Sequence, residues 1–256
     1  MTNKSMKYLV LTGATGAIGQ ALVQYYAAPG IHLTLQGRNR PLLEQIQQTA
    51  ENAGAVVRIA ALDLTDQTAL QQWLSELPQQ QIDLMILNHG MNINHGADNS
   101  GETWQDAEQL LQLNLLSTMA IVHAVLPQMR QCRRGQIALV SSLAAWYGLP
   151  VTPSYSASKA ALKAYGEGMR GWLEPQGVKM NVILPGYVDS AMSQAMPGPK
   201  PFLWTPERAA RHIALRLAAN QGRISFPFPL NLGCWLLAVI HPAVSQRILS
   251  WLNYRG

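Results

Sequence analysis

The chain has 256 residues, of which 48% are hydrophobic and 13% are charged, and this composition excludes an intrinsically disordered protein. The net charge is +5, but the basic residues are scattered and form no stripe interleaved with aromatic residues, which argues against nucleic-acid binding. Two isolated cysteines, Cys132 and Cys234, are too few for a disulfide framework or a zinc site. We therefore expect free thiols, no metal site and a cytoplasmic protein.

Segments that alternate between strand and helix fill the first two thirds of the chain. Short apolar runs predict strands at 7–12, 31–35, 56–61, 83–87, 136–140 and 179–184. Helices are predicted between them at 18–28, 40–53, 66–77, 103–131 and 154–174. Because the strands are apolar throughout rather than alternating, both faces of the sheet should be covered. The pattern predicts a doubly wound, Rossmann-type α/β fold that binds ligands at the carboxyl ends of parallel strands.

The last third of the chain is less regular. Residues 191–204 read as an irregular lid, and Thr205-Pro206-Glu207 begins a helix that ends near Gly222. An apolar run at 230–240 stops at His241-Pro242 and is too short to span a bilayer. It could lie in a membrane interface, pack against the core over the substrate pocket, or meet a second subunit. We expect one domain over 1–256, with a cofactor-binding and catalytic core at 1–190 and a lid with C-terminal helices at 191–256.

Glycines follow the first predicted strand in the segment Thr12-Gly13-Ala14-Thr15-Gly16-Ala17-Ile18-Gly19. Such a turn lets backbone N–H groups approach a pyrophosphate at a helix N-terminus. The second strand ends in Gln36-Gly37-Arg38, with no carboxylate to bind the ribose hydroxyls of NAD. Because a guanidinium suits a 2′-phosphate, this segment predicts NADP rather than NAD.

Tyr155 and Lys159 lie four residues apart in a helical run, so their side chains share one helix face. A free phenol has a pKa of about 10, and a neighbouring ammonium should lower it. The spacing therefore predicts a tyrosine that transfers a proton. Ser142 lies 13 residues before this tyrosine, at the end of the fifth strand. Asn114 interrupts an otherwise apolar helix, which suggests a functional role or a buried hydrogen-bonding one.

Together these residues resemble the short-chain dehydrogenase/reductase family in its shorter, single-domain branch, over about residues 7–190. The resemblance implies a catalytic set of Asn114, Ser142, Tyr155 and Lys159. Tyr155 would exchange a proton with the substrate oxygen, which Ser142 holds in place. Lys159 would lower the Tyr155 pKa and bind the nicotinamide ribose, and Asn114 would hold a water. Cofactor contacts are implied for Gly13, Thr15, Ile18, Gly19, Arg38, Asp63, Leu64, Asn88, Gly90, Tyr155, Lys159, Pro185, Gly186, Val188 and Ser190.

Three residues near strand ends either depart from the family pattern or have more than one interpretation. Ala17 stands where the family usually has its middle glycine. Asp63 would contact the adenine by resemblance, but it could equally cap the turn before Thr65-Asp66. A lone histidine at a strand end, His89, is expected to be structural rather than a catalytic base.

The implied activity is that of an NADP(H)-dependent oxidoreductase that interconverts a carbonyl and an alcohol. Methionines and aromatic residues near the catalytic positions suggest a hydrophobic substrate contacted by Trp146, Tyr147, Met192 and Met196. The resemblance also implies a homodimer or homotetramer built on the two long helices, and residues 230–256 could add a peripheral membrane contact. Two alternatives are a dinucleotide-sensing protein without chemistry and a membrane-associated lipid-handling protein.

Overall fold

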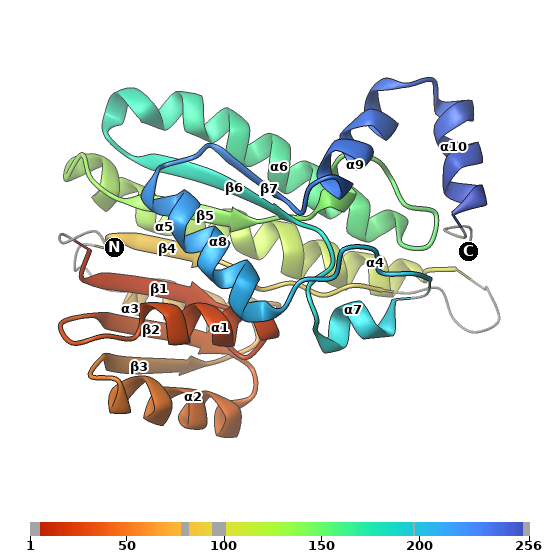
Figure 1. The fold of residues 1–256 in the computed structure, drawn as a ribbon. Helices are drawn as coiled ribbons and strands as arrows, with labels where there is room; N and C mark the ends of the chain where they lie inside the picture. The colour runs from red at the N-terminus through yellow and green to blue at the C-terminus, as the bar shows by residue number, and fades with distance from the viewer. Residues whose placement is uncertain (1–5, 78–81, 94–100, 197, 253–256) are drawn as a thin grey trace.

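Seven parallel strands form a sheet at the centre of the molecule. The structure is a computed structural model and describes residues 6–77, 82–93, 101–196 and 198–252. The strand order is β3-β2-β1-β4-β5-β6-β7, so the chain reverses its direction of winding between β1 and β4 (Figure 1). The strands are β1 (Tyr8–Thr12), β2 (His32–Gly37), β3 (Val56–Ala61), β4 (Leu84–Leu87), β5 (Gln136–Val140), β6 (Lys179–Pro185) and β7 (Arg223–Phe226). The predicted doubly wound α/β fold is confirmed.

Apolar side chains alternate between two cores, one on each face of the sheet. Leu9 and Leu11 of β1 pack into the core that also holds side chains of α1 (Ala17–Tyr26), α2 (Arg40–Asn52) and α8 (Pro206–Ala218). Val10 points the other way, into the core with α3 (Gln67–Glu76), α5 (Ser117–Gln131) and α6 (Pro153–Leu173). Continuous apolar strands are therefore explained by helices on both faces, as the sequence pattern predicts.

The helix expected over 103–131 is interrupted rather than regular. It consists of α4 (Trp104–Leu111), a π-helical segment (Gln112–Leu116) and α5. The stretch Trp104–Gln131 is long and apolar enough to cross a membrane, but half of its most apolar window is buried, as in the core helix of a soluble protein. Two short 3₁₀ turns, Leu143–Ala145 and Glu174–Gln176, flank α6.

Two short elements were not predicted from the sequence. Strand β7 pairs with β6, but its four residues, Arg-Ile-Ser-Phe, carry too little periodic signal to be recognised. The segment after Ser190, expected to be irregular, contains the short helix α7 (Ala191–Ala195). A capping box between Ser190 and Ser193 holds its first turn, a local pairing of two serines that carries little signal in the sequence.

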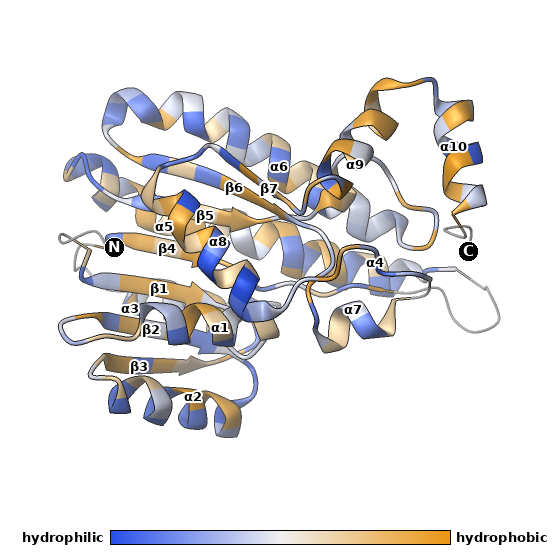
Figure 2. Ribbon diagram, in the orientation of Figure 1, coloured by the Kyte–Doolittle hydropathy of each residue, from blue (hydrophilic) through white to orange (hydrophobic). Residues whose placement is uncertain are grey.

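Helices α9 (Leu230–Val239) and α10 (Pro242–Trp251) form a hairpin in the C-terminal part of the chain, and α9 is apolar. Figure 1 shows the strand arrows pointing toward the side of the molecule where α7, α9 and α10 lie. Figure 2 shows that α9 is coloured largely as hydrophobic, whereas α10 mixes hydrophobic and hydrophilic residues. The hairpin therefore lies beyond the carboxyl ends of the strands, where the fold predicts a ligand.

Candidate active site

A cavity of about 1040 Å³ opens at the carboxyl ends of the central strands. Its lining runs from the glycine turn after β1, past the ends of β4, β5 and β6, to α7 and the C-terminal hairpin. Among the described residues, no group of histidine, cysteine, aspartate and glutamate is arranged to hold a metal ion. The site must therefore be understood through its glycines, hydroxyl groups and one buried lysine.

Two glycines of the turn are required by close approach of the backbone. Gly13 has a φ of +62°, and an added Cβ would lie 2.8 Å from the backbone of His89. At Gly19 an added Cβ would lie 2.2 Å from the carbonyl oxygen of Gly13. Gly16 differs, because its Cβ would meet nothing nearer than 3.5 Å, and it provides α1 with no side-chain cap. The turn thus presents a helix N-terminus to the cavity, which suits a pyrophosphate.

Two amides hold this turn in place. Asn88, just after β4, donates from Nδ2 to the carbonyl oxygen of Gly13 at 3.0 Å. Gln36, in β2, accepts from the N–H of Gly13 at 3.2 Å and donates to the carbonyl oxygen of Leu62 at 2.9 Å. Gln36 is only 2% exposed. Sequence reasoning assigned it no role, although a polar residue near the end of an otherwise apolar strand is a usable signal.

Arg38 lies at the rim of the cavity beside Asp63. Its Nη1 is 3.5 Å from the Asp63 carboxylate, and the two side chains are 64% and 38% exposed. Burial would raise the pKa of Asp63, but hydrogen bonds from the backbone and hydroxyl of Thr65 and the charge of Arg38 lower it on balance. Asp63 therefore caps the turn by accepting hydrogen bonds from the N–H and the hydroxyl of Thr65, which is one of its two expected roles. An adenine contact by Asp63 stays a prediction.

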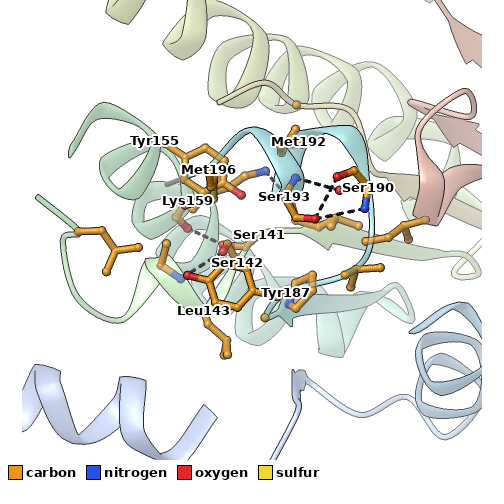
Figure 3. A pocket seen from close by; sticks show the side chains of 18 of the residues that line it. Ser141, Ser142, Leu143, Tyr155, Lys159, Tyr187, Ser190, Met192, Ser193 and Met196 are labelled. Atoms are coloured by element: carbon orange, nitrogen blue, oxygen red, sulfur yellow. Dashed lines mark hydrogen bonds between the residues drawn. The ribbon is translucent and has the colours of Figure 1, made fainter. Parts of the chain in front are cut away.

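Three side chains converge where β5 ends and α6 begins. Ser142 follows β5, and Tyr155 and Lys159 project from the first turns of α6 around the same pocket (Figure 3). Lys159 is 4% exposed, donates to the carbonyl oxygen of Val140 at 2.9 Å, and lies 5.6 Å from the centre of the Tyr155 ring. The helical spacing of four residues thus brings the phenol and the ammonium together, as the sequence predicts.

The acidity of the phenol differs from the expectation. Burial raises the pKa of Tyr155, and a hydrogen bond with Ser142 opposes this only in part. Burial also lowers the pKa of Lys159 to about 8, so its ammonium is mostly charged at pH 7 and loses its charge at mildly alkaline pH. On balance the Tyr155 pKa is raised rather than lowered, because removal from water is the largest cause of its shift. Tyr155 is therefore a protonated phenol at neutral pH. A lowering contribution from Lys159 stays a prediction.

Asn114 lies in the π-helical segment and is fully buried. Its amide clamps the backbone of Met91, accepting from the N–H at 2.8 Å and donating to the carbonyl oxygen at 2.9 Å. It also donates to the hydroxyl of Ser158 at 3.1 Å. Gly90 has no side chain to separate Asn114 from Lys159, since an added Cβ would lie 3.3 Å from both. The irregular helix thus brings Asn114 behind the lysine rather than into the cavity.

His89 is buried in a cluster of hydroxyl groups. Its Nδ1 is 2.7 Å from the hydroxyl of Thr12, and its Nε2 is 2.9 Å and 3.0 Å from those of Ser117 and Thr118. Burial is the main cause that lowers the His89 pKa to about 3, and the charge of Lys159 adds to it. The imidazole is therefore neutral.

The proton arrangement on His89 follows from its partners. Ser117 and Thr118 donate their hydroxyl protons to the backbone carbonyls of Leu113 and Asn114. Their oxygens can therefore only accept from His89, which places the ring proton on Nε2 and leaves Nδ1 to accept from Thr12. His89 joins the glycine turn to the π-helical segment, which is the structural role expected of it.

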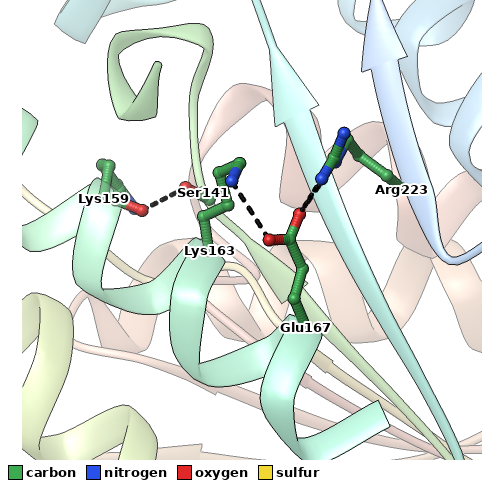
Figure 4. A network of polar contacts seen from close by, with 5 residues as sticks. All are labelled: Ser141, Lys159, Lys163, Glu167 and Arg223. Carbon is green, nitrogen blue, oxygen red and sulfur yellow. Dashed lines mark hydrogen bonds and ion pairs between the residues drawn. The ribbon is translucent and has the colours of Figure 1, made fainter. Parts of the chain in front are cut away.

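A polar network holds α6 against β7 beside the site (Figure 4). Glu167 pairs with Lys163 at 3.1 Å and also with Arg223 of β7. Both cations lie over the ring of Trp146, at 4.5 Å and 4.7 Å from its centre. Ser141, next to Ser142, donates to the backbone carbonyl of Lys159 at 2.7 Å. The network fixes the helix that carries Tyr155 relative to the strands.

Most of the predicted site residues line the cavity, and four do not. Gly19, Asp63, Asn114 and Trp146 are absent from its lining. The first three support residues that do line it, whereas Trp146 is engaged with the α6 network described above. The predicted residues that the structure brings together are Gly13, Thr15, Ile18, Arg38, Leu64, Asn88, Gly90, Ser142, Tyr147, Tyr155, Lys159, Pro185, Gly186, Val188, Ser190, Met192 and Met196.

Known proteins share this sequence pattern and this fold. The family model of the short chain dehydrogenases matches residues 7–199. The chain belongs to this family. An uncharacterized oxidoreductase of Myxococcus xanthus is 31% identical over 90% of this chain and 91% of its own length. The chain is therefore an oxidoreductase of the NAD(P)-dependent short-chain dehydrogenase type.

Solved structures of short-chain dehydrogenases resemble the whole chain. That of a short-chain dehydrogenase from Sphingobium yanoikuyae in complex with NADPH superimposes with a TM-score of 0.82 over 96% of both chains, at 21% identity. The bulky-bulky ketone specific alcohol dehydrogenase from Comamonas testosteroni gives 0.80 over 96% of this chain and 94% of that one, at 19% identity. At these identities the likeness concerns the fold.

Proposed function

We propose that this protein is an NADP(H)-dependent carbonyl reductase that acts on a hydrophobic aldehyde or ketone. The observation that carries the proposal is the convergence of Ser142, Tyr155 and Lys159 in one apolar cavity, with Tyr155 held protonated. A phenol that keeps its proton at neutral pH can give it to a carbonyl oxygen as hydride reaches the carbonyl carbon.

The residues of the chain have separate parts in the reaction. When NADPH is bound it supplies the hydride that adds to the carbonyl carbon. Ser142 donates a hydrogen bond to the carbonyl oxygen and holds it beside Tyr155. The Tyr155 hydroxyl gives its proton to that oxygen, so the product is an alcohol. Lys159 contributes its positive charge near the resulting phenolate, and Asn114 holds Met91 and Ser158 in place behind it.

The residues present fit a dinucleotide. Gly13 and Gly19 allow the turn to pack closely against the backbone, and the N-terminus of α1 that follows it faces the cavity. The preference for NADP rests on Arg38, an exposed guanidinium at the rim with no carboxylate at the end of β2. We expect Arg38→Asp to raise KM for NADPH at least about tenfold and to lower the preference over NADH. Arg40→Asp is the control, because Arg40 is equally exposed and pairs with Glu44 away from this cavity.

Replacing Tyr155 by phenylalanine tests the proton-donor assignment. We expect Tyr155→Phe to lower kcat by about 10²–10⁴-fold while the Kd for NADPH, measured by fluorescence, stays unchanged. Tyr165→Phe on the same helix is the control, since the buried Tyr165 hydroxyl has no hydrogen-bond partner. If Tyr155→Phe retains full turnover, the assignment is wrong. If the unmodified protein binds NADPH but reduces no carbonyl, the dinucleotide-sensing alternative takes its place.

Peripheral contact with a membrane is the second proposal, and it concerns the C-terminal hairpin of residues 230–252. Helix α9 has no buried residue, and Trp235, Val239 and Trp251 are 42%, 57% and 83% exposed. No acidic residue follows Glu207 in the sequence, so nothing there repels anionic headgroups. We expect the protein to float with anionic vesicles and Trp251→Glu to lose this binding. Trp104→Glu, a change of an exposed tryptophan on α4, should keep it.

The remaining expectations are proposed in the same way. The resemblance supports a homodimer or homotetramer in the cytoplasm, and exposed Leu116 and Trp172 on the long helices would lie in its interface. Light scattering after size-exclusion chromatography measures the subunit number. The division into a core at 1–190 and a lid with C-terminal helices at 191–256 is tested by limited proteolysis.

A further inference from the structure

The cavity extends well beyond the catalytic residues, onto the C-terminal hairpin. Leu230, Gly233, Cys234, Leu236 and Leu237 line it from α9, followed by Ile240 just after the helix, and most of these residues share one helix face. A spacing of three or four residues produces this shared face. A helix of ten residues is about 15 Å long, so the lining on this side is elongated.

This part of the cavity offers almost no polar group. Among the described residues that line it from α9 and α10, none is charged. The thiol of Cys234 is the one polar side chain, and burial raises its pKa to about 11, so it stays neutral. Met192 and Met196 of the lid also line the cavity with flexible apolar side chains. A polar group on a ligand that reached this region would lose its water without gaining a partner.

Hydrogen bonds fix the hairpin over the cavity. Ser245 of α10 is fully buried and donates to the carbonyl oxygen of Leu237 at 2.8 Å, which joins the two helices. Gln246 donates from Nε2 to the hydroxyl of Tyr147 at 3.2 Å, which ties α10 to the segment after Ser142. The elongated apolar lining is therefore held in a constant position relative to the catalytic serine.

We propose that the region lined by α9 and α10 is a subsite for an unbranched alkyl tail. The substrate is then a long-chain aldehyde or ketone, with its carbonyl at Ser142 and Tyr155 and its tail along α9. This inference rests on the proposed carbonyl reductase function and specifies its substrate class. A ring system with a second polar group would leave that group unpaired against the hairpin.

Chain length is the variable that tests the subsite. With NADPH and straight-chain aldehydes from butanal to dodecanal, we expect kcat/KM of the unmodified protein to rise by up to about fourfold per added methylene. Gly233 is suited to blocking the subsite, because an added Cβ there meets no atom within 4 Å. Gly233→Leu should lower the ratio of kcat/KM for dodecanal to that for hexanal by about tenfold or more.

Gly168→Leu is the matched control, since Gly168 is also a helical glycine with open space around its Cβ but lies on α6, away from the cavity. It should leave the ratio unchanged. A second measurement needs no turnover: in a Cys132→Ser background, dodecanol should slow methanethiosulfonate modification of Cys234, and butanol should not.

Different results would disprove the alkyl-tail subsite and the reductase function. Equal efficiency with hexanal and dodecanal, or a preference for bulky ring ketones that Gly233→Leu leaves intact, overturns the tail subsite while carbonyl reduction stands. If the unmodified protein reduces no aldehyde but dodecanol still protects Cys234, the reductase function is overturned and the subsite is supported.

Discussion

Replacing His89 by phenylalanine tests the network that joins the glycine turn after β1 to the π-helical segment. The substitution keeps a planar ring of similar size but removes both nitrogens and their three hydrogen bonds, to Thr12, Ser117 and Thr118. Each such bond is worth about 0.5–1.5 kcal/mol, so the variant should lose about 2–4 kcal/mol of unfolding free energy. For a chain of this size that corresponds to a fall in Tm of about 4–16 °C.

The pH dependence of this loss is specific to His89. Its pKa in the folded protein is lowered from 6.5 to about 3, so between these values the unfolded chain binds a proton that the folded chain does not. The stability that His89 contributes is therefore complete above pH 6.5 and declines by about 1.4 kcal/mol per pH unit below it. The difference in unfolding free energy between the unmodified protein and His89→Phe should shrink as the pH falls from 7 to about 4.

Urea unfolding at several pH values measures this difference, with His123→Phe as the control because His123 is exposed on α5. Nitrogen NMR should show the proton of His89 on Nε2 with a bare Nδ1 throughout the neutral range. A variant as stable as the unmodified protein, or a ring proton on Nδ1, would refute the reasoning.

Three further outcomes follow from the site geometry. Gly19→Ala should raise the Kd for NADPH at least about tenfold, because its Cβ would lie 2.2 Å from a backbone oxygen, whereas Gly16→Ala should change it little in the same titration. In a pH profile of reduction, kcat/KM should fall above about pH 8 as Lys159 loses its charge, and a flat profile up to about pH 9 would contradict this. Glu167→Gln should cost about 1 kcal/mol in urea unfolding at neutral pH, against no change for the exposed Glu174→Gln. Because ion pairs lower the Glu167 pKa despite burial, this difference should vanish as the pH falls through that lowered pKa.

Much of the fold could be predicted because the signals are local. Strands β1, β4, β5 and β6 are each followed directly by a glycine, an asparagine or a serine, and the parallel topology brings those ends to one edge of the sheet. The pairing of Tyr155 with Lys159 depends only on helical spacing. Residues whose roles depend on their immediate neighbours in sequence were therefore placed where the structure has them.

The remaining features depend on contacts between distant segments. The pKa of Tyr155 is set by how completely the folded chain buries it, which spacing alone does not report. Trp146 was expected to contact substrate because it lies near Ser142, but Lys163 and Arg223 cover its ring. Gln246 meets Tyr147 across 99 residues, so no local pattern could show that the hairpin closes over the cavity.

The extra residue of the π-helical segment limits how the chain can change in length during evolution. Deleting one residue from Gln112–Leu116 would convert this segment into regular α-helix, so α4 and α5 would keep their buried faces, but side chains within the segment would turn by up to about 100° about the helix axis. Asn114 would then lose its hydrogen bonds to Met91 and Ser158. Insertions and deletions should be absorbed in the loops of this protein, whereas the helix that carries Asn114 should keep a constant number of residues.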